Sequence, residues 1–184
     1  MSDGANEPSP ADIIAFWRDV GPKRWFEKDE TVDAEIKQRF RARHDEAAAG
    51  KLAAWEQSAQ GALALLILLD QFSRNMFRGQ ARAFASDELA RAIASRAILN
   101  GFDGAFDDMR TFFYLPFMHS EDLADQERSV AFYRAHGDER SLKYAALHAD
   151  IIRRFGRFPH RNAALGRTTT PEEQAYLDSG GFAG

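Results

Sequence analysis

The chain has 184 residues and a formal net charge of −4 at pH 7, and 45% of its residues are hydrophobic. This length and composition fit one globular domain, which we expect to span residues 1–184. The net acidity argues against a protein that coats nucleic acid, because such proteins usually carry a basic overall field. Since the chain has no cysteine, disulfides, thiolate metal sites and cysteine nucleophiles are excluded.

The beginning of the chain, MSDGANEPSPAD, has neither a basic start nor an apolar stretch, so it does not resemble a secretory signal. The longest apolar run, Ala62–Leu69, is too short to span a bilayer. We therefore expect a cytoplasmic protein with no membrane contact. Residues 1–8 are expected to be flexible, and residues 171–184 should form a short C-terminal helix and a tail.

Helix start and stop signals follow one another through the first third of the chain. The stretch Ser9–Asp12 combines a cap residue with a proline at the first helical position. A second helix is expected from about Thr31 to Ala49, where Gly50 is a favourable stop. A third helix should start near Ser58, and it is apolar nearly all round, which predicts that it is buried.

The middle of the chain carries the same kind of signals. A fourth helix is expected to be capped by Ser86 and stopped by Gly101. A fifth should cover roughly Asp107–Leu115, because Pro116 bends or ends a helix. A sixth is expected to begin near Ser120.

Two further helices complete the expected fold. One should begin near Asp138 and stop at Gly156, and Thr170–Glu173 forms a capping-box signal for a short last helix. No alternating apolar run bounded by hairpin turns is present, so the pattern predicts an all-α protein. Short connections favour antiparallel neighbours, hence stacked helix hairpins without a strict repeat.

Polar residues interrupt the apolar pattern in the stretch LLDQFSRNMFRG, Leu68–Gly79. Asp70 follows the most apolar helix, so we expect it to be partly buried and to need a partner. Arg74 lies four residues on and can reach it within a helix. One interpretation is a structural ion pair that fixes the turn. The other is a ligand site in which Asp70, Arg74 and Asn75 form a pocket floor.

A second polar stretch follows a helical stripe made of His119, Leu123, Gln126, Val130 and Tyr133. Leu123 and Val130 are expected to point inward, which places His119 and Gln126 on the same side. These two residues are either core residues with internal partners or ligand contacts. Without an HExxH pattern or a second histidine four residues on, a metal site is not expected.

The third polar stretch, RRFGRFPHRNAALGR at Arg153–Arg167, holds five arginines and a histidine without any acid. Phe155, Phe158 and Pro159 should anchor it to the core, so its charges would lie on a fixed turn. Guanidinium groups favour carboxylate and phosphate through paired donors. The candidate ligand residues here are Arg154, Arg157, His160, Arg161 and Asn162, and His119 is expected to face them.

The competing interpretation is that these arginines pair with carboxylates of other helices. The acids that we consider for such pairing are Asp70, Glu121, Asp122 and Asp125.

These stretches carry a resemblance to a known family. The motifs are LLDQFSRNMFRG, ARAFASDELA, LPFMHSEDLADQERSV and RFGRFPHRNAALGR, followed by TPEE. With them, the chain resembles the mainly bacterial, uncharacterised family called domain of unknown function 924, from about Asp12 to Phe182. The resemblance implies an all-helical, tetratricopeptide-like stack of helix hairpins. It implies no activity and no catalytic residues.

Two functions are left open by the sequence. The first is a pocket for a small phosphorylated or carboxylated ligand, formed by the candidate residues above. The second is a tetratricopeptide-like interaction module that binds an acidic peptide or a chain-terminal carboxylate. Nucleic-acid binding is least favoured because of the net acidity. The sequence assigns no catalytic residue and predicts neither a cofactor nor a metal, and it does not decide whether the protein is an enzyme.

Overall fold

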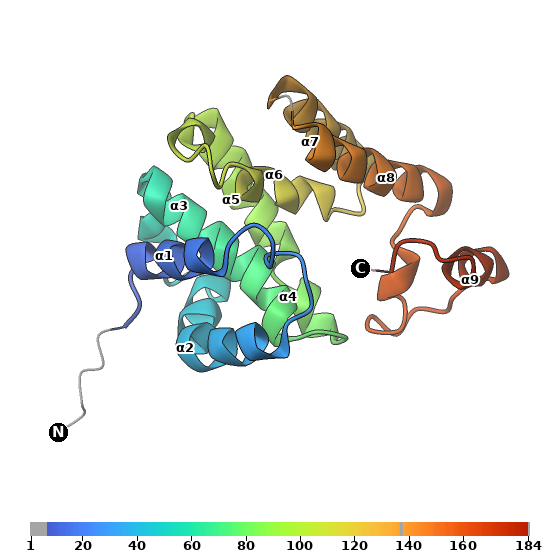
Figure 1. Ribbon diagram of the computed structural model, residues 1–184, viewed down its shortest axis with the longest axis horizontal. Coiled ribbons are helices and arrows are strands. Elements are labelled where there is room, and N and C mark those ends of the chain that lie inside the picture. Colours follow the sequence, from blue (N-terminus) through green and yellow to red (C-terminus); the bar gives the residue numbers. More distant parts are fainter. Residues whose placement is uncertain (1–6, 137, 184) are drawn as a thin grey trace. The chain divides into compact units, whose positions relative to one another are not determined.

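The computed structural model describes residues 7–136 and 138–183, and it contains helices and turns but no strand in those ranges (Figure 1). The all-α class expected from the sequence is therefore confirmed. The α-helices are α1 Pro10–Val20, α2 Glu30–Ala48, α3 Ala59–Leu66, α4 Ser73–Met76, α5 Asp87–Leu99, α6 Thr111–Met118, α7 Leu123–His136, α8 Glu139–Phe155 and α9 Pro171–Asp178. The 3₁₀ and π turns are η1 Ala53–Gln57, η2 Ile67–Phe72, η3 Ala81–Phe84, η4 Phe102–Ala105 and η5 Pro159–Arg161.

The chain divides into two compact units, which are described separately here. The first unit comprises residues up to 78 together with 82–116, and the second comprises 79–81 and 117–184. The sequence predicts flexibility for residues 1–8, and residues 1–6 of that segment lie outside the described residues. In the described part of the chain, no helix has both the length and the apolar character needed to cross a membrane.

An aromatic cluster holds the first unit together. The rings of Phe16 and Phe40 lie 5.0 Å apart, and Phe72 lies 5.1 Å from Phe40. Trp17 meets Phe72 edge-on at 5.3 Å. From Gly61 to its end, α3 is buried on every side, as its apolar sequence predicts. The aromatic rings and this buried helix both belong to the apolar core of the unit.

The buried helix does not stay regular. After Leu66, α3 passes into the π turn η2 and then into the short helix α4. A π turn contains an extra residue, and such turns occur frequently at functional sites. The sequence pattern did not predict this irregularity. The π turn η2 contains Asp70 and Gln71, and both side chains are buried.

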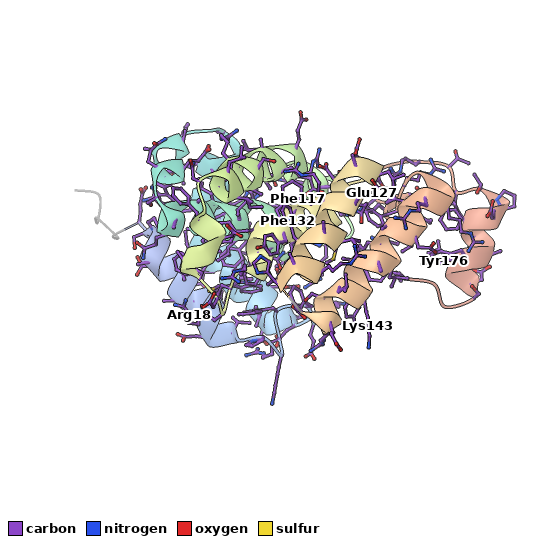
Figure 2. All side chains as sticks on the ribbon, turned by 90° about the horizontal axis from the view of Figure 1, so that it is seen from above. Arg18, Phe117, Glu127, Phe132, Lys143 and Tyr176 are labelled. Carbon is purple, nitrogen blue, oxygen red and sulfur yellow. The ribbon has the colours of Figure 1, made fainter. Side chains whose placement is uncertain are left out.

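In the second unit, α7 and α8 pack side by side (Figures 1 and 2). The ring of Phe117, at the end of α6, lies 5.5 Å from that of Phe132 of α7. Both side chains are labelled in Figure 2. Helix α8 ends at Gly156 in the left-handed conformation (φ 69°), as expected. Helix α9 begins with the predicted capping box between Thr170 and Glu173.

Three local predictions were wrong. Pro116 lies inside α6, which continues to Met118, because a proline removes only one backbone hydrogen bond from this largely buried helix. The Ser86 hydroxyl makes no cap bond to α5 and instead donates to the Leu69 carbonyl at 2.6 Å. Leu123 is 39% exposed, because the buried face of α7 is formed by other residues, namely Gln126, Ser129 and Tyr133.

Gly61 allows α3 to approach η1 closely, and this contact gives a testable prediction. A Cβ atom at position 61 would lie 2.1 Å from the Trp55 carbonyl oxygen, whereas a Cβ at Gly104 would meet nothing within 4 Å. We expect Gly61→Ala to lower the free energy of unfolding by about 1–3 kcal/mol through overpacking. Gly104→Ala is the matched control and should change it little. Urea denaturation of both variants measures the difference, and equal stability would contradict the contact.

Candidate functional site

Asp70 and Arg74 form the partly buried pair that the sequence predicts. The Asp70 side chain is 2% exposed and that of Arg74 is 20% exposed, and Arg74 Nη1 lies 3.1 Å from Asp70 Oδ1. The same nitrogen donates to the Asp70 carbonyl at 2.9 Å. Gln71 Nε2 donates to Asp70 Oδ2 at 2.5 Å. The buried carboxylate is thus met by a cation and an amide, as desolvation requires.

A second carboxylate, missed by the sequence analysis, shares the same guanidinium. Arg74 donates from Nη1 to Asp87 Oδ1 at 3.0 Å and from Nη2 to Asp87 Oδ2 at 2.9 Å. Burial lowers the pKa of Arg74, but the charges of Asp70 and Asp87 outweigh it and raise the pKa above its ordinary value. Asp87 is the first residue of α5, where a carboxylate has an ordinary role, so nothing in its sequence context indicated this pair.

Asn75, the third candidate of the first unit, is directed towards α2. Its amide donates to Asp33 Oδ1 at 2.7 Å, and Arg78 pairs with the same carboxylate at 2.6 Å. The three candidates Asp70, Arg74 and Asn75 therefore lie on one continuous stretch, and each makes an internal hydrogen bond.

In the second unit, a turn formed by residues 117–120 is held from two sides. Gln126 Nε2 donates to the carbonyls of Met118 and Ser120, both at 2.6 Å, and at 3.4 Å to that of Phe117. Arg161 Nη2 donates to the His119 carbonyl at 2.9 Å. Carbonyls at a helix end lack helical partners, so these donors satisfy groups that would otherwise be orphaned. Gln126 is inward-facing, as predicted.

Within the arginine-rich turn, which we define as residues 153–167, Arg157 is paired with Glu173. Arg157 donates to the two carboxylate oxygens at 2.5 and 2.8 Å. Asn162 Nδ2 and the backbone N–H of Thr170 also donate to Glu173, at 3.2 and 2.8 Å. Mainly through the hydrogen bonds from Arg157, the pKa of Glu173 is lowered from 4.5 to about 2.

Arg167 and Glu121 form a second bidentate pair, at 2.7 and 3.0 Å. Glu121 also accepts the backbone N–H of Phe158 at 2.7 Å, and Arg167 Nε donates to Asn162 Oδ1 at 3.0 Å. Burial raises the pKa of Glu121, but the hydrogen bonds from Arg167 and Phe158 outweigh it, so the pKa lies below its ordinary value. The two pairs meet at Asn162, which contacts both.

The internal-pairing interpretation therefore describes several of the arginines. Arg154 pairs at 3.2 Å with Glu172, and both side chains are largely exposed. Of the acids considered for pairing, Glu121 is a partner of the turn, whereas Asp122 accepts backbone N–H groups at the start of α7. The partners Glu172 and Glu173 belong to the last helix. In the sequence these two acids were interpreted only as part of the signal that starts this helix.

The His160 imidazole lies between aromatic rings of the second unit. Its ring is 5.6 Å from Phe158 and 5.3 Å from Phe182. Burial, followed by the charge of Arg161, lowers the pKa of His160 to about 3, so the ring is neutral at pH 7. The His160 Nδ1 atom is buried, and no described residue forms a hydrogen bond with it. The guanidinium of Arg161 lies over the Phe158 ring at 4.5 Å.

On the buried face of α7, Oε1 of Gln126 and Oγ of Ser129, three residues apart, have no hydrogen-bond partner among the described residues either. Buried polar atoms normally have a hydrogen-bond partner, so each such atom without one needs an explanation, for example strain, a catalytic role, or a water or ion. Thus two residues chosen from the sequence, Gln126 and His160, each retain an unsatisfied atom.

The ten candidate residues are distributed over both units. The first unit contains Asp70, Arg74 and Asn75, and the second contains His119, Gln126, Arg154, Arg157, His160, Arg161 and Asn162. Within the second unit, Arg161 and Gln126 meet at the turn 117–120, and Arg157 and Asn162 meet at Glu173. Within residues 7–136 and 138–183, no group of three or more acids and histidines is arranged to hold a metal ion.

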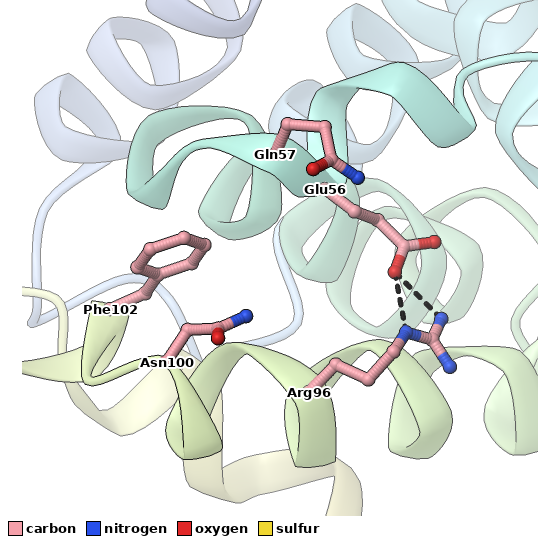
Figure 3. Close-up of a pocket in the computed structure, with 5 residues that line it drawn as sticks. All are labelled: Glu56, Gln57, Arg96, Asn100 and Phe102. Atoms are coloured by element: carbon pink, nitrogen blue, oxygen red, sulfur yellow. Dashed lines mark hydrogen bonds and ion pairs between the residues drawn. The ribbon is translucent and has the colours of Figure 1, made fainter.

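A hollow in the first unit was not expected from the sequence. It has a volume of about 390 Å³ and is lined by five residues, namely Glu56, Gln57, Arg96, Asn100 and Phe102 (Figure 3). These residues come from η1, the end of α5 and the start of η4, none of which contains a motif that attracts notice.

Comparison with known proteins gives one family and one solved structure. The family described as bacterial protein of unknown function (DUF924) matches residues 13–181. The chain is also similar to the structure of the protein of unknown function ATU0120 from Agrobacterium tumefaciens, with 49% sequence identity and a TM-score of 0.89. That similarity covers 92% of this chain and 97% of the other. No curated protein matches the chain.

The shared guanidinium of Arg74 gives a prediction on stability. Arg74→Met should lower the free energy of unfolding by about 3–5 kcal/mol, because it leaves the carboxylates of Asp70 and Asp87 buried without their cation. The double variant Asp70→Asn, Arg74→Met should lose less than the sum of the two single losses. A double-mutant cycle by chemical denaturation measures this coupling, and additive losses would contradict the pair.

Glu173 gives a prediction on acid stability. Because its pKa is about 2 in the folded chain and ordinarily 4.5, its stabilisation is complete above about pH 4.5 and is lost as the pH falls towards 2. We expect Glu173→Gln to be less stable than the wild type at pH 7, with a difference that shrinks across this window. Denaturation curves at a series of pH values measure the difference, and a pH-independent gap would contradict the assignment.

Proposed function

We propose that this chain, which belongs to the bacterial family of proteins of unknown function DUF924, binds a small phosphorylated or carboxylated ligand at the arginine-rich turn of its second unit. The observation that carries the proposal is the buried Nδ1 atom of His160, beside Arg161, which has no hydrogen-bond partner in residues 7–136 and 138–183. His119, whose carbonyl accepts a hydrogen bond from Arg161, is proposed to border the same site.

The electrostatics of the turn favour an anion. The carboxyl groups of Glu121 and Glu173 both have lowered pKa values, and the nearby guanidinium groups are the main cause of the lowering in each. The pKa of His160 is lowered mainly by burial and then by the charge of Arg161. The cations thus favour negative charge in this part of the unit. A neutral imidazole can donate one N–H to an anion without adding charge of its own.

The unsatisfied atoms of α7 indicate what else the ligand should carry. Oε1 of Gln126 can only accept a hydrogen bond, whereas Oγ of Ser129 can donate or accept. A ligand that satisfies Gln126 must therefore supply an O–H or N–H group. Together with an anionic group, this favours a phosphate ester or a carboxylic acid that also bears a hydroxyl or amide group.

The other candidates have a supporting role in this proposal. Arg154, Arg157 and Asn162 are proposed to stay in their internal pairs and to fix the turn, because each already bonds to Glu172 or Glu173. The candidates of the first unit, which are Asp70, Arg74 and Asn75, remain proposed ligand residues of that unit. Ligand contact there requires exchange of their present internal bonds.

Three further expectations from the sequence are also proposed here. The α7–α8 pair is a helix hairpin, which supports a stack of tetratricopeptide-like hairpins. Binding of an acidic peptide or chain terminus is proposed as the alternative function, since the same N–H donors can donate to a peptide carboxylate. A cytoplasmic location is the third.

Phosphate binding to the full chain tests the proposal. Phosphate stabilises most proteins in a general way, so thermal unfolding is compared at equal ionic strength in phosphate and in chloride. When phosphate is present at 100 times its Kd, binding at one specific site adds about 2.7 kcal/mol to the free energy of unfolding. This raises the Tm of a chain of this size by several degrees. His160→Phe keeps an aromatic ring in place and removes the nitrogen, and it should lose this increment.

His44→Phe is the matched control. His44 is a buried histidine of the first unit, and it too has a ring nitrogen, Nε2, without a partner. The control should keep the full phosphate response. If the wild type, His160→Phe and His44→Phe respond alike, the proposed site is refuted.

A further inference from the structure

The hollow between η1 and the end of α5 has the features of a second, separate ligand site. Its volume of about 390 Å³ lies in the range of small-molecule sites. Figure 3 shows Glu56 and Gln57 on one side, Asn100 and Arg96 on the other, and the ring of Phe102 at one end. Two layers of polar groups therefore face each other beside an aromatic wall.

Two polar side chains of the hollow, those of Gln57 and Asn100, are exposed to solvent and available to a ligand in exchange for water. In the described part of the chain, the side-chain amides of Gln57 and Asn100 make no hydrogen bond. Each amide offers two N–H donors and one carbonyl acceptor. The ring of Phe102 has no aromatic or cationic partner within residues 7–136 and 138–183. An aromatic face and two unused amides at one hollow are the elements of a site for a flat, polar ligand.

The two charges of the hollow neutralise each other. Arg96 Nε and Nη2 both lie 2.7 Å from the same oxygen, Oε2 of Glu56. Figure 3 shows both contacts at this single oxygen, which leaves Oε1 of Glu56 as an unused acceptor. Since the pair has no net charge, the hollow favours an uncharged ligand over a free anion or cation.

From these groups we infer that the hollow binds a neutral purine base of the adenine type. A carboxamide pairs in two-point fashion with the N6 donor and N7 acceptor of adenine, as Asn and Gln side chains do in nucleic-acid recognition. Asn100 or Gln57 supplies this pairing, and Oε1 of Glu56 accepts the remaining N6 hydrogen. The base stacks on Phe102, a contact that tolerates any planar ring and adds affinity.

The position of η1 makes the site dependent on α3. Glu56 and Gln57 lie on η1, which contacts α3 at Gly61, where the Trp55 carbonyl approaches the helix too closely for any side chain. Gln57 is the last residue of η1, and Asn100 lies in the short turn that directly follows α5, so the two amides lie on opposite walls. Such support favours a defined binding geometry.

Titration of the full chain with adenosine tests this inference. Adenosine has no anionic group, so its binding is independent of the phosphate site proposed above. Calorimetry should show saturable binding, and Phe102→Leu should weaken it at least about fivefold through loss of one base–aromatic stack. The double variant Gln57→Ala, Asn100→Ala, which removes both amides, should weaken it as well, and in the wild type the side-chain amide signals of Gln57 and Asn100 should shift in NMR spectra.

Two controls make the outcome decisive. Phe26→Leu removes a phenylalanine of the same unit that is 62% exposed and does not line the hollow, so it should leave adenosine binding unchanged. His160→Phe should also leave it unchanged, since that residue belongs to the other unit. Absence of saturable binding at millimolar adenosine overturns the inference. So does unchanged affinity in Phe102→Leu, or equal affinity for uridine, which offers a different edge.

Discussion

A carboxylate that leaves water must be met by a cation or by several hydrogen-bond donors, and both units of this chain are organised by that requirement. In the first unit, Asp70 and Asp87 share the guanidinium of Arg74. In the second, Glu173 receives Arg157 and Asn162. Because breaking such a pair strands a buried charge, these contacts make separation of the segments that carry them costly.

The arginine-rich turn shows how this constraint is compatible with the proposed binding function. Arginines that have a carboxylate fix the course of the chain from Gly156 to Thr170, and the side chains held in place by that frame include His160 and Arg161. Positioned donors lose less entropy on binding than mobile ones. The same frame explains why the segment has both aromatic anchors and charge: Phe158 packs in the core while its backbone N–H binds Glu121.

Much of the fold could be predicted because the ends of helices are determined by residues close to them in the sequence. Ser9, Gly156 and Thr170 act within a few residues of themselves, and each acts as predicted. The site could be predicted only in part. Gln126 was identified because it is a polar residue at a position where the helical pattern expects a buried apolar one. Glu121 and Arg167, in contrast, lie 46 residues apart, and no local pattern encodes a contact between residues so distant in the sequence. The π turn at Asp70 escaped for a similar reason, since tertiary packing decides whether a buried apolar helix is regular.

Native-state hydrogen exchange of the arginine-rich turn tests most directly whether buried carboxylates hold it. In Glu173→Gln, the account predicts faster exchange of turn amides such as that of Arg167, which bonds to the Asn162 carbonyl, while α7 and α8 keep their protection. Glu172→Gln, which removes only an exposed pair, should leave the turn unchanged. Wild-type protection of the turn in Glu173→Gln would contradict the account.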